Sequence, residues 1–142
     1  MANAAGPSRR APEASEDPGP LARVVLHYQD LMKQLVPTAT SPNDWGPLAE
    51  LVAVDAFERT GSFLEVQSWR EYTEMLTQWA SRISRFETTV HRISELSNLV
   101  YFEIEERHFS GSSVGVVNSM TVFGFDVEAK ICHLDVYLQQ SR

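Results

Sequence analysis

The second half of the chain carries four long segments in which apolar and polar residues alternate loosely, a pattern typical of strands. Residues that favour turns separate the segments, so consecutive strands should pair as hairpins. At about 3.3 Å per residue, strands of this length span roughly 35–40 Å, and a sheet built from them should twist and curl. The predicted strands are Phe86–Glu95, Leu99–Phe109, Val114–Phe125 and Lys130–Gln139.

Two long helices are predicted in the first half. Leu21–Val36 repeats apolar side chains at the i, i+3, i+4 and i+7 spacing of one helix face. Tyr28 lies in this apolar stripe, so its hydroxyl must find a polar partner or face a cavity. Ser68 and Glu71 form a capping box, which predicts a second helix from there to about Ser84. A short helix at 45–51 and short strands within 52–63 and 63–67 complete the prediction.

This order of elements predicts an α+β fold. We expect a strongly curved antiparallel sheet that wraps around the long N-terminal helix and forms a cone with an internal pocket. The single domain should cover residues 21–142. Residues 1–20 contain four prolines and no large apolar residue after Met1, so we expect a disordered leader there.

The net charge of −7 narrows the set of partners. Nucleic acids and anionic membrane surfaces bind basic proteins, so neither is expected as a partner. No apolar run approaches the roughly 20 residues that span a bilayer. The one cysteine, Cys132, allows no disulfide within the chain, which fits a reducing compartment, and we expect a cytoplasmic protein.

One local feature points to chemistry. Alternation along 99–109 places Glu106 and His108 on the inward face, two residues apart and near the end of the strand. Such a pair can act as general acid and base, because the carboxylate orients the imidazole and sets its protonation. In the alternative interpretation, Glu106 pairs with Arg59 or Arg92 at the cone mouth and His108 faces solvent.

Two strand registers stay open at this point. In 114–125, either the face with Ser119 and Thr121 or the opposite face points inward. In 56–60, either Phe57 and Arg59 or Glu58 and Thr60 point inward. A slip of one residue reverses the answer in each case.

The residues expected to bind substrate are Trp45 (at the pocket rim), Phe57, Arg59, His91, Phe102, Ile104, Ser119, Thr121, Leu134 and Val136.

No metal site or cofactor is predicted. The strand histidines have no short ligand spacing between them, and the chain has no glycine-rich phosphate loop. In the last strand we expect Cys132 to point inward in an apolar row, as an inert thiol.

Several segments together resemble the nuclear transport factor 2-like superfamily, and within it the SnoaL-like branch. They are the helix segment Val24–Tyr28, the segment Ala53–Arg59, the capped helix at Ser68 and the closing strand Lys130–Leu138. The resemblance covers residues 21–139. It implies the cone fold and a homodimer, and it groups the chain with polyketide cyclases, ketosteroid isomerases, limonene epoxide hydrolases and scytalone dehydratase.

The catalytic residues of this family carry over only in part. Tyr28 matches the helix tyrosine that serves ketosteroid isomerases as oxyanion donor. Their general-base aspartate falls near Arg59 or Thr60, and their second acid falls near Thr121, so no carboxylate stands at either place.

The other two enzymes match no better. Limonene epoxide hydrolases use one Arg and two Asp, and of the corresponding positions only Glu106 is an acid. Scytalone dehydratase has a tyrosine and strand histidines, for which Tyr28, His91 and His108 are loose counterparts.

We therefore expect a cofactor-independent enzyme of proton-transfer type, an isomerase, lyase (dehydratase) or cyclase. Its substrate would be a hydrophobic cyclic or aromatic small molecule bound in the pocket. Glu106 and His108 would move the proton, Tyr28 would hydrogen-bond the developing oxyanion, and Arg59 or Trp45 would position the substrate.

The alternative is a non-catalytic small-molecule-binding or interaction module. It is favoured by the missing acids near Thr60, Thr121 and Val136, and it predicts ligand binding without product. A third interpretation is an assembly domain whose outer sheet face is its only active surface.

We also expect a homodimer through the outer face of the sheet, where aromatic, apolar and charged residues mix on long strands: Tyr101, Ile131, His133, Asp135 and Tyr137. Light scattering at micromolar concentration should give twice the chain mass of 16.0 kDa. A mass equal to one chain would refute this expectation.

Overall fold

The computed structural model describes residues 18–141. The leader expected at 1–20 lies outside the described residues up to residue 17, and the first helix already begins at Pro20. The helices are α1 (Pro20–Leu35), α2 (Gly46–Ala49) and α3 (Trp69–Ala80), with single 3₁₀ turns at Pro42–Trp45 and Val54–Ala56. The strands are β1 (Glu58–Thr60), β2 (Val66–Gln67), β3 (Arg85–Leu96), β4 (Leu99–Ser110), β5 (Ser113–Phe125) and β6 (Ile131–Gln140).

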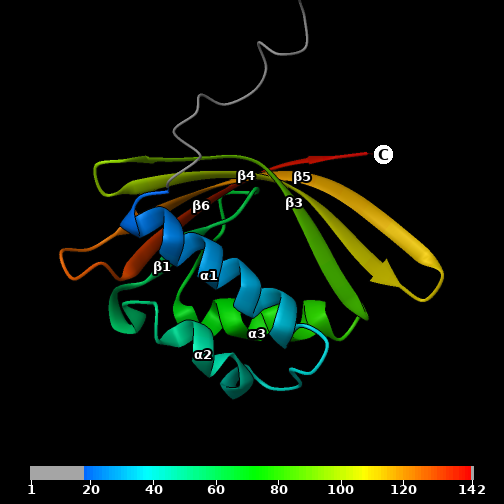
Figure 1. Cartoon of the computed structure of the whole chain (residues 1–142). Coiled ribbons are helices and arrows are strands. Elements are labelled where there is room, and N and C mark those ends of the chain that lie inside the picture. The colour runs from blue at the N-terminus through cyan, green and yellow to red at the C-terminus, as the bar shows by residue number, and fades with distance from the viewer. Residues whose placement is uncertain (1–17, 142) are drawn as a thin grey trace, which may run out of the picture.

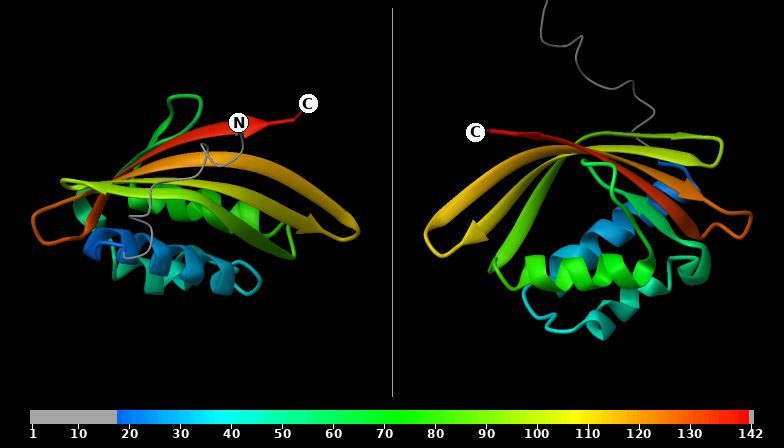
Figure 2. Two further views of the ribbon diagram at one scale, coloured as in Figure 1. Left: turned by 45° about the horizontal axis from the view of Figure 1, so that its top comes forward. Right: turned by 180° about the vertical axis from the view of Figure 1, so that it is seen from behind.

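The six strands form one sheet in the order β2-β1-β6-β5-β4-β3. The four long strands pair antiparallel with their sequence neighbours, whereas β1 runs parallel to β6, so the sheet is mixed rather than wholly antiparallel. Figure 1 shows the sheet curving over α1 and α3, with α2 farther out. The views in Figure 2 show that the sheet stays open at its edges. The predicted α+β cone is confirmed.

The long elements lie within one residue of their predicted ends, apart from α3, which stops at Ala80. The predictions for the short elements were less accurate. The strand expected over 52–63 shrinks to β1, because Val52 makes only an isolated bridge to Ile131 before a 3₁₀ turn. The short helix expected at 45–51 is split between a 3₁₀ turn and α2.

A bulge in β6 overturns two predictions of side-chain direction. Gly124 pairs with His133 and Phe125 pairs with Ile131, so Cys132 is the extra residue in the ladder. Ile131 is consequently buried rather than on the outer face, and Cys132 is half-exposed rather than part of the inward row. Tyr101 and Tyr137 do lie exposed on their strands.

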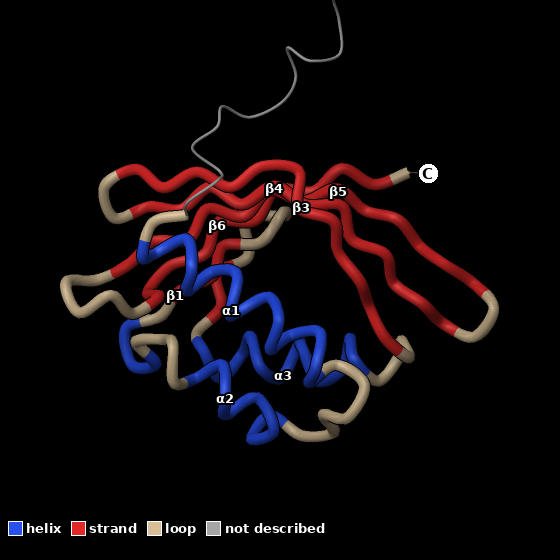
Figure 3. Tube along the Cα trace, viewed as in Figure 1, coloured by secondary structure: helices blue, strands red, loops and turns tan. Residues whose placement is uncertain are grey.

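The apolar core fills only part of the concave side. Val25 of α1, Leu48 of α2, and Val100 and Phe102 of β4 are almost wholly buried in it. Figure 3 shows the hairpin between β4 and β5 extending past the ends of α1 and α3. Among the described residues, no helix is both long and apolar enough to cross a bilayer.

The capping box at the start of α3 is confirmed. The Glu71 backbone N–H donates to Ser68 Oγ at 3.2 Å, and the Ser68 N–H donates to Glu71 Oε1 at 2.9 Å. Two N–H groups that the helix cannot satisfy are thereby paired.

Ser68→Ala should lower the free energy of unfolding by about 1 kcal/mol, because the N-cap acceptor is lost. Urea denaturation measures the change, with the exposed turn residue Ser62 replaced by Ala as the matched control. Equal losses in the two variants would show that the cap contributes nothing specific.

Candidate functional site

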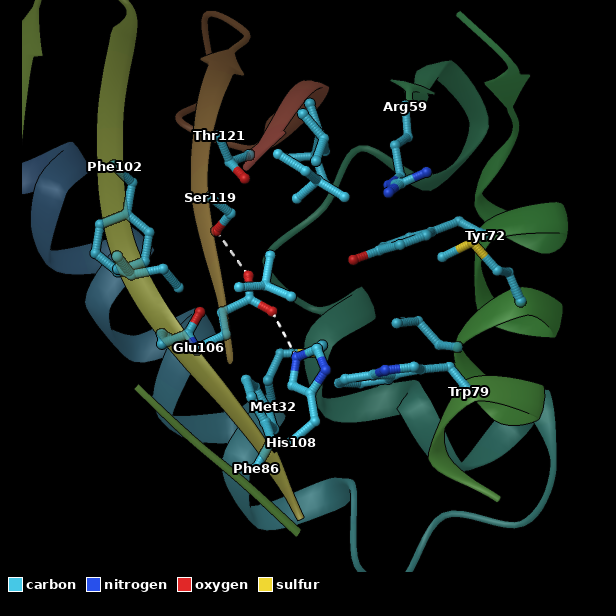
Figure 4. A pocket seen from close by; sticks show the side chains of 18 of the residues that line it. Met32, Arg59, Tyr72, Trp79, Phe86, Phe102, Glu106, His108, Ser119 and Thr121 are labelled. Carbon is cyan, nitrogen blue, oxygen red and sulfur yellow. Dashed lines mark hydrogen bonds and ion pairs between the residues drawn. The ribbon is translucent and has the colours of Figure 1, made fainter. Parts of the chain in front are cut away.

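A cavity of about 400 Å³ lies between α1, α3 and the concave face of the sheet. Figure 4 shows Glu106, Ser119 and Thr121 on strands along one side, opposite Tyr72 and Trp79 of α3. Ten of the thirteen predicted site residues line the cavity: Tyr28, Arg59, Phe102, Ile104, Glu106, His108, Ser119, Thr121, Leu134 and Val136.

Glu106 is the centre of a hydrogen-bonded polar group formed with His108 and Ser119. His108 Nε2 lies 2.8 Å from Glu106 Oε1, and Ser119 Oγ donates to Glu106 Oε2 at 2.6 Å. Both carboxylate oxygens are thus held, which fixes the direction of the group. The alternative pairing of Glu106 with an arginine does not occur, because Arg92 binds Glu103 and Arg59 binds Gln67.

His108 is held between apolar rings rather than facing open solvent. Its imidazole packs edge-on against Trp79 at 5.4 Å and Phe86 at 6.1 Å between centroids. Among the described residues, Nδ1 has no hydrogen-bond partner. With Nε2 donating to the carboxylate, Nδ1 is the nitrogen left to accept a proton.

A pair of tyrosines forms the second polar feature. The hydroxyls of Tyr28 and Tyr72 lie 3.1 Å apart, and both side chains are buried. Burial raises the pKa of Tyr28 well above its usual value, and the nearby Tyr72 raises it further. Burial also raises the pKa of Tyr72, against an opposing effect of Arg59. Both hydroxyls are therefore protonated at neutral pH, and since the pair uses only one of the two protons, the other can be donated to a ligand oxygen.

Both open registers are decided by pairing. Arg59 pairs with Leu134 of β6, and both side chains line the cavity. Ser119 pairs with Ile104 of β4, so the face of β5 with Ser119 and Thr121 is the inward one.

Three predicted substrate-binding residues lie elsewhere. Trp45 is not at the rim: its side chain is 0% exposed in the core, where Nε1 donates to Thr77 Oγ1 at 3.0 Å. Phe57 is buried against Trp69, with ring centroids 5.2 Å apart. His91 is exposed, because the register of β3 shifts between Val90 and Arg92 and leaves it as the extra residue of a bulge.

Some cavity residues on the helices were not predicted from the sequence. Tyr72 and Trp79 belong to the apolar stripe of α3, which periodicity assigns to the core without separating core from cavity. Tyr72, like Tyr28, places a hydroxyl group in an otherwise apolar helix face, and this could have indicated a cavity residue. Gln29, which follows Tyr28 and is also buried beside the cavity, gave no such signal.

No protein-family model matches the sequence, and no curated protein matches it. Solved structures do match. An NTF2-like protein from Anabaena variabilis has a TM-score of 0.69 at 14% identity, covering 88% of this chain and 95% of that one. The protein has the NTF2-like fold. The resemblance noted in the sequence is thereby confirmed at the level of the fold.

Two further structures share this fold. A protein from Shewanella denitrificans, proposed to be a SnoaL-like polyketide cyclase, has a TM-score of 0.68 at 10% identity, covering 85% of this chain and 92% of that one. An LEH-like epoxide hydrolase from M. tuberculosis has a TM-score of 0.60 at 18% identity, covering 84% and 82%. Neighbours with this fold thus have names that indicate different reactions, and the fold alone does not select among them.

The arrangement of the His, Cys, Asp and Glu side chains decides whether the described residues can bind a metal ion. Within residues 18–141, no group of three or more His, Cys, Asp or Glu side chains is arranged to hold a metal ion.

The tyrosine pair predicts a distinct alkaline behaviour. Because folding raises both pKa values, folding favours the protonated hydroxyls, and stability should fall as pH rises above the ordinary tyrosine pKa of about 10. Urea denaturation at several alkaline pH values should show a smaller fall for the Tyr28→Phe, Tyr72→Phe double variant than for the wild type. Equal slopes would contradict the raised pKa values.

Proposed function

We propose that this protein is a cofactor-independent enzyme that transfers a proton on a hydrophobic cyclic or aromatic small molecule, as an isomerase, lyase or cyclase. The observation that carries the proposal is the Glu106–His108 pair, bonded at 2.8 Å on the wall of a largely apolar cavity. A volume of about 400 Å³ lies in the range of small-molecule sites.

In the proposed reaction, His108 Nδ1 takes a proton from a carbon next to a carbonyl group. Glu106, held by Ser119, keeps the other proton on Nε2 and stabilises the imidazolium that forms. The electron pair of the broken C–H bond moves to the carbonyl oxygen. That oxygen accepts the free hydroxyl proton of the Tyr28–Tyr72 pair as a hydrogen bond.

The fate of the enolate decides the reaction class. Return of the proton to another carbon gives isomerisation, departure of a β-substituent gives elimination, and attack on a second carbonyl group gives cyclisation. The rings of Trp79, Phe86 and Phe102 supply an apolar wall that shields the ion from water. The neighbours named as a proposed polyketide cyclase and an epoxide hydrolase support a small-molecule reaction in this fold, without indicating which one.

The second candidate is a binding module without chemistry. It is favoured by Thr121 and Val136, which line the cavity where the family resemblance would place acids. In that case the polar group around Glu106 would only orient a ligand.

A base in an apolar cavity can be tested without knowing the substrate. Nitrobenzisoxazole loses its ring C–H proton to a base, the N–O bond breaks, and a coloured cyanophenolate forms. The Glu106→Gln, His108→Gln double variant should lower the rate of this elimination about 100-fold or more, because the general base is lost. Absorbance follows the reaction, and fluorescence of the neutral dye Nile red checks that the cavity still binds apolar ligands.

His91→Gln is the matched control, since His91 is an exposed strand histidine outside the cavity, and its rate should equal that of the wild type. A double variant as fast as the wild type would remove the acid–base assignment. Dye binding by a wild-type protein that shows no elimination above buffer would favour the binding module.

A further inference from the structure

We infer that the cavity recognises a carboxylate on its ligand, and that Arg59 is the residue that binds it. The inference rests on the proposed function for the location of the site and adds a class of substrate: hydrophobic ring compounds that carry an acid group. Three observations on the Arg59 guanidinium support this inference: its hydrogen-bond partners, its burial and the neighbouring groups that hold it in place.

Arg59 is a buried cation with spare donors. Its side chain is 12% exposed, and Nη1 donates to Gln67 Oε1 at 2.9 Å. Among the described residues, Nε and Nη2 have no hydrogen-bond partner. A buried donor without an acceptor destabilises the folded protein, and a guanidinium fork matches the two oxygens of a carboxylate.

The carboxylate nearest to Arg59 in the protein forms only a long ion pair with it. Glu65 approaches Arg59 Nη1 only at 3.8 Å, its side chain is 42% exposed, and its other oxygen accepts the backbone N–H of Phe63 at 2.9 Å. An ion pair of this length with a solvated partner contributes little. The closest polar partner of Arg59 is the neutral amide of Gln67. A ligand carboxylate would supply the missing anion.

The guanidinium is already held in place for binding. It lies over the ring of Tyr72, 5.3 Å from the centroid, and Figure 4 shows it beside that ring on the cavity wall. Gln67, which accepts from Arg59, is itself fixed by a contact of its Nε2 to Met75 Sδ at 3.6 Å. A fixed fork loses little freedom on binding, which favours affinity.

The charge balance of the cavity agrees with an anionic ligand. Two arginines, Arg59 and Arg82, line it, against one carboxylate, Glu106, whose oxygens are both engaged. This local excess of positive charge occurs in a chain of net charge −7. Gln29 also lines the cavity, and its buried Nε2 has no partner among the described residues.

The test compares ligands that differ only in charge. Isothermal titration of full-length protein with naphthaleneacetate and with its neutral amide should show the acid binding about tenfold more tightly or better. Benzene and anthracene analogues of the pair extend the comparison to smaller and larger rings. Arg59→Gln should reduce the preference to near unity while the affinity for the amides stays the same.

Two more variants keep the test decisive. Gln67→Glu retains the arginine and gives it an anion inside the protein, so this variant should also lose the preference even if Arg59→Gln folds poorly. Arg85→Gln removes one exposed positive charge from β3 and should leave the preference unchanged, which controls for long-range effects.

Four outcomes overturn the inference: no acid preference in the wild type across the three ring sizes, no acid binding at all, a preference that survives Arg59→Gln, or a preference that survives Gln67→Glu. Because the readout is binding, it is independent of the elimination assay. If no acid preference is found, the proposed role of His108 is unaffected. If no elimination is found, the proposed carboxylate site is unaffected.

Discussion

The cavity exists because the strands are much longer than the helices that cover them. Strands β3, β4 and β5 have 12 to 13 residues and extend about 40 Å at the rise of a strand. Helix α1, with 16 residues, extends about 24 Å, and α3, with 12, about 18 Å. The helices can therefore fill only part of the concave face with side chains. Between the helices and the curved sheet they leave a cavity, which Tyr28 of α1 and Tyr72 of α3 line together with strand residues.

This mismatch divides single strands into two environments. On β4, Val100 is a core residue, Phe102 lies in the core and also lines the cavity, and Glu106 and His108 farther along the same face meet the cavity. A partly buried carboxylate is tolerated there because two hydrogen bonds from side chains satisfy it. The apolar rings around the imidazole keep it close to its carboxylate partner. Core packing and the polar group thus depend on the same alternation of side chains.

Most of the fold could be predicted because it follows from local periodicity. Alternation located the long strands and placed Glu106 and His108 inward, and the helix period exposed Tyr28 as a polar tip in an apolar stripe. The bulges could not be predicted, because a single extra residue does not change the alternation on either side of it in a recognisable way. They changed the direction of the Ile131 and His91 side chains. The direction of Arg59 depends on parallel pairing with Leu134, 75 positions later in the chain.

The separation of core and cavity along each strand has a consequence for how such a protein can change over generations. Substitutions at His108 or Ser119 would change the polar lining of the cavity at a distance from the packing around Val100, so this lining can vary without first losing the fold. Two solved structures of this fold, a proposed polyketide cyclase at 10% identity and an epoxide hydrolase at 18%, have names that indicate different reactions.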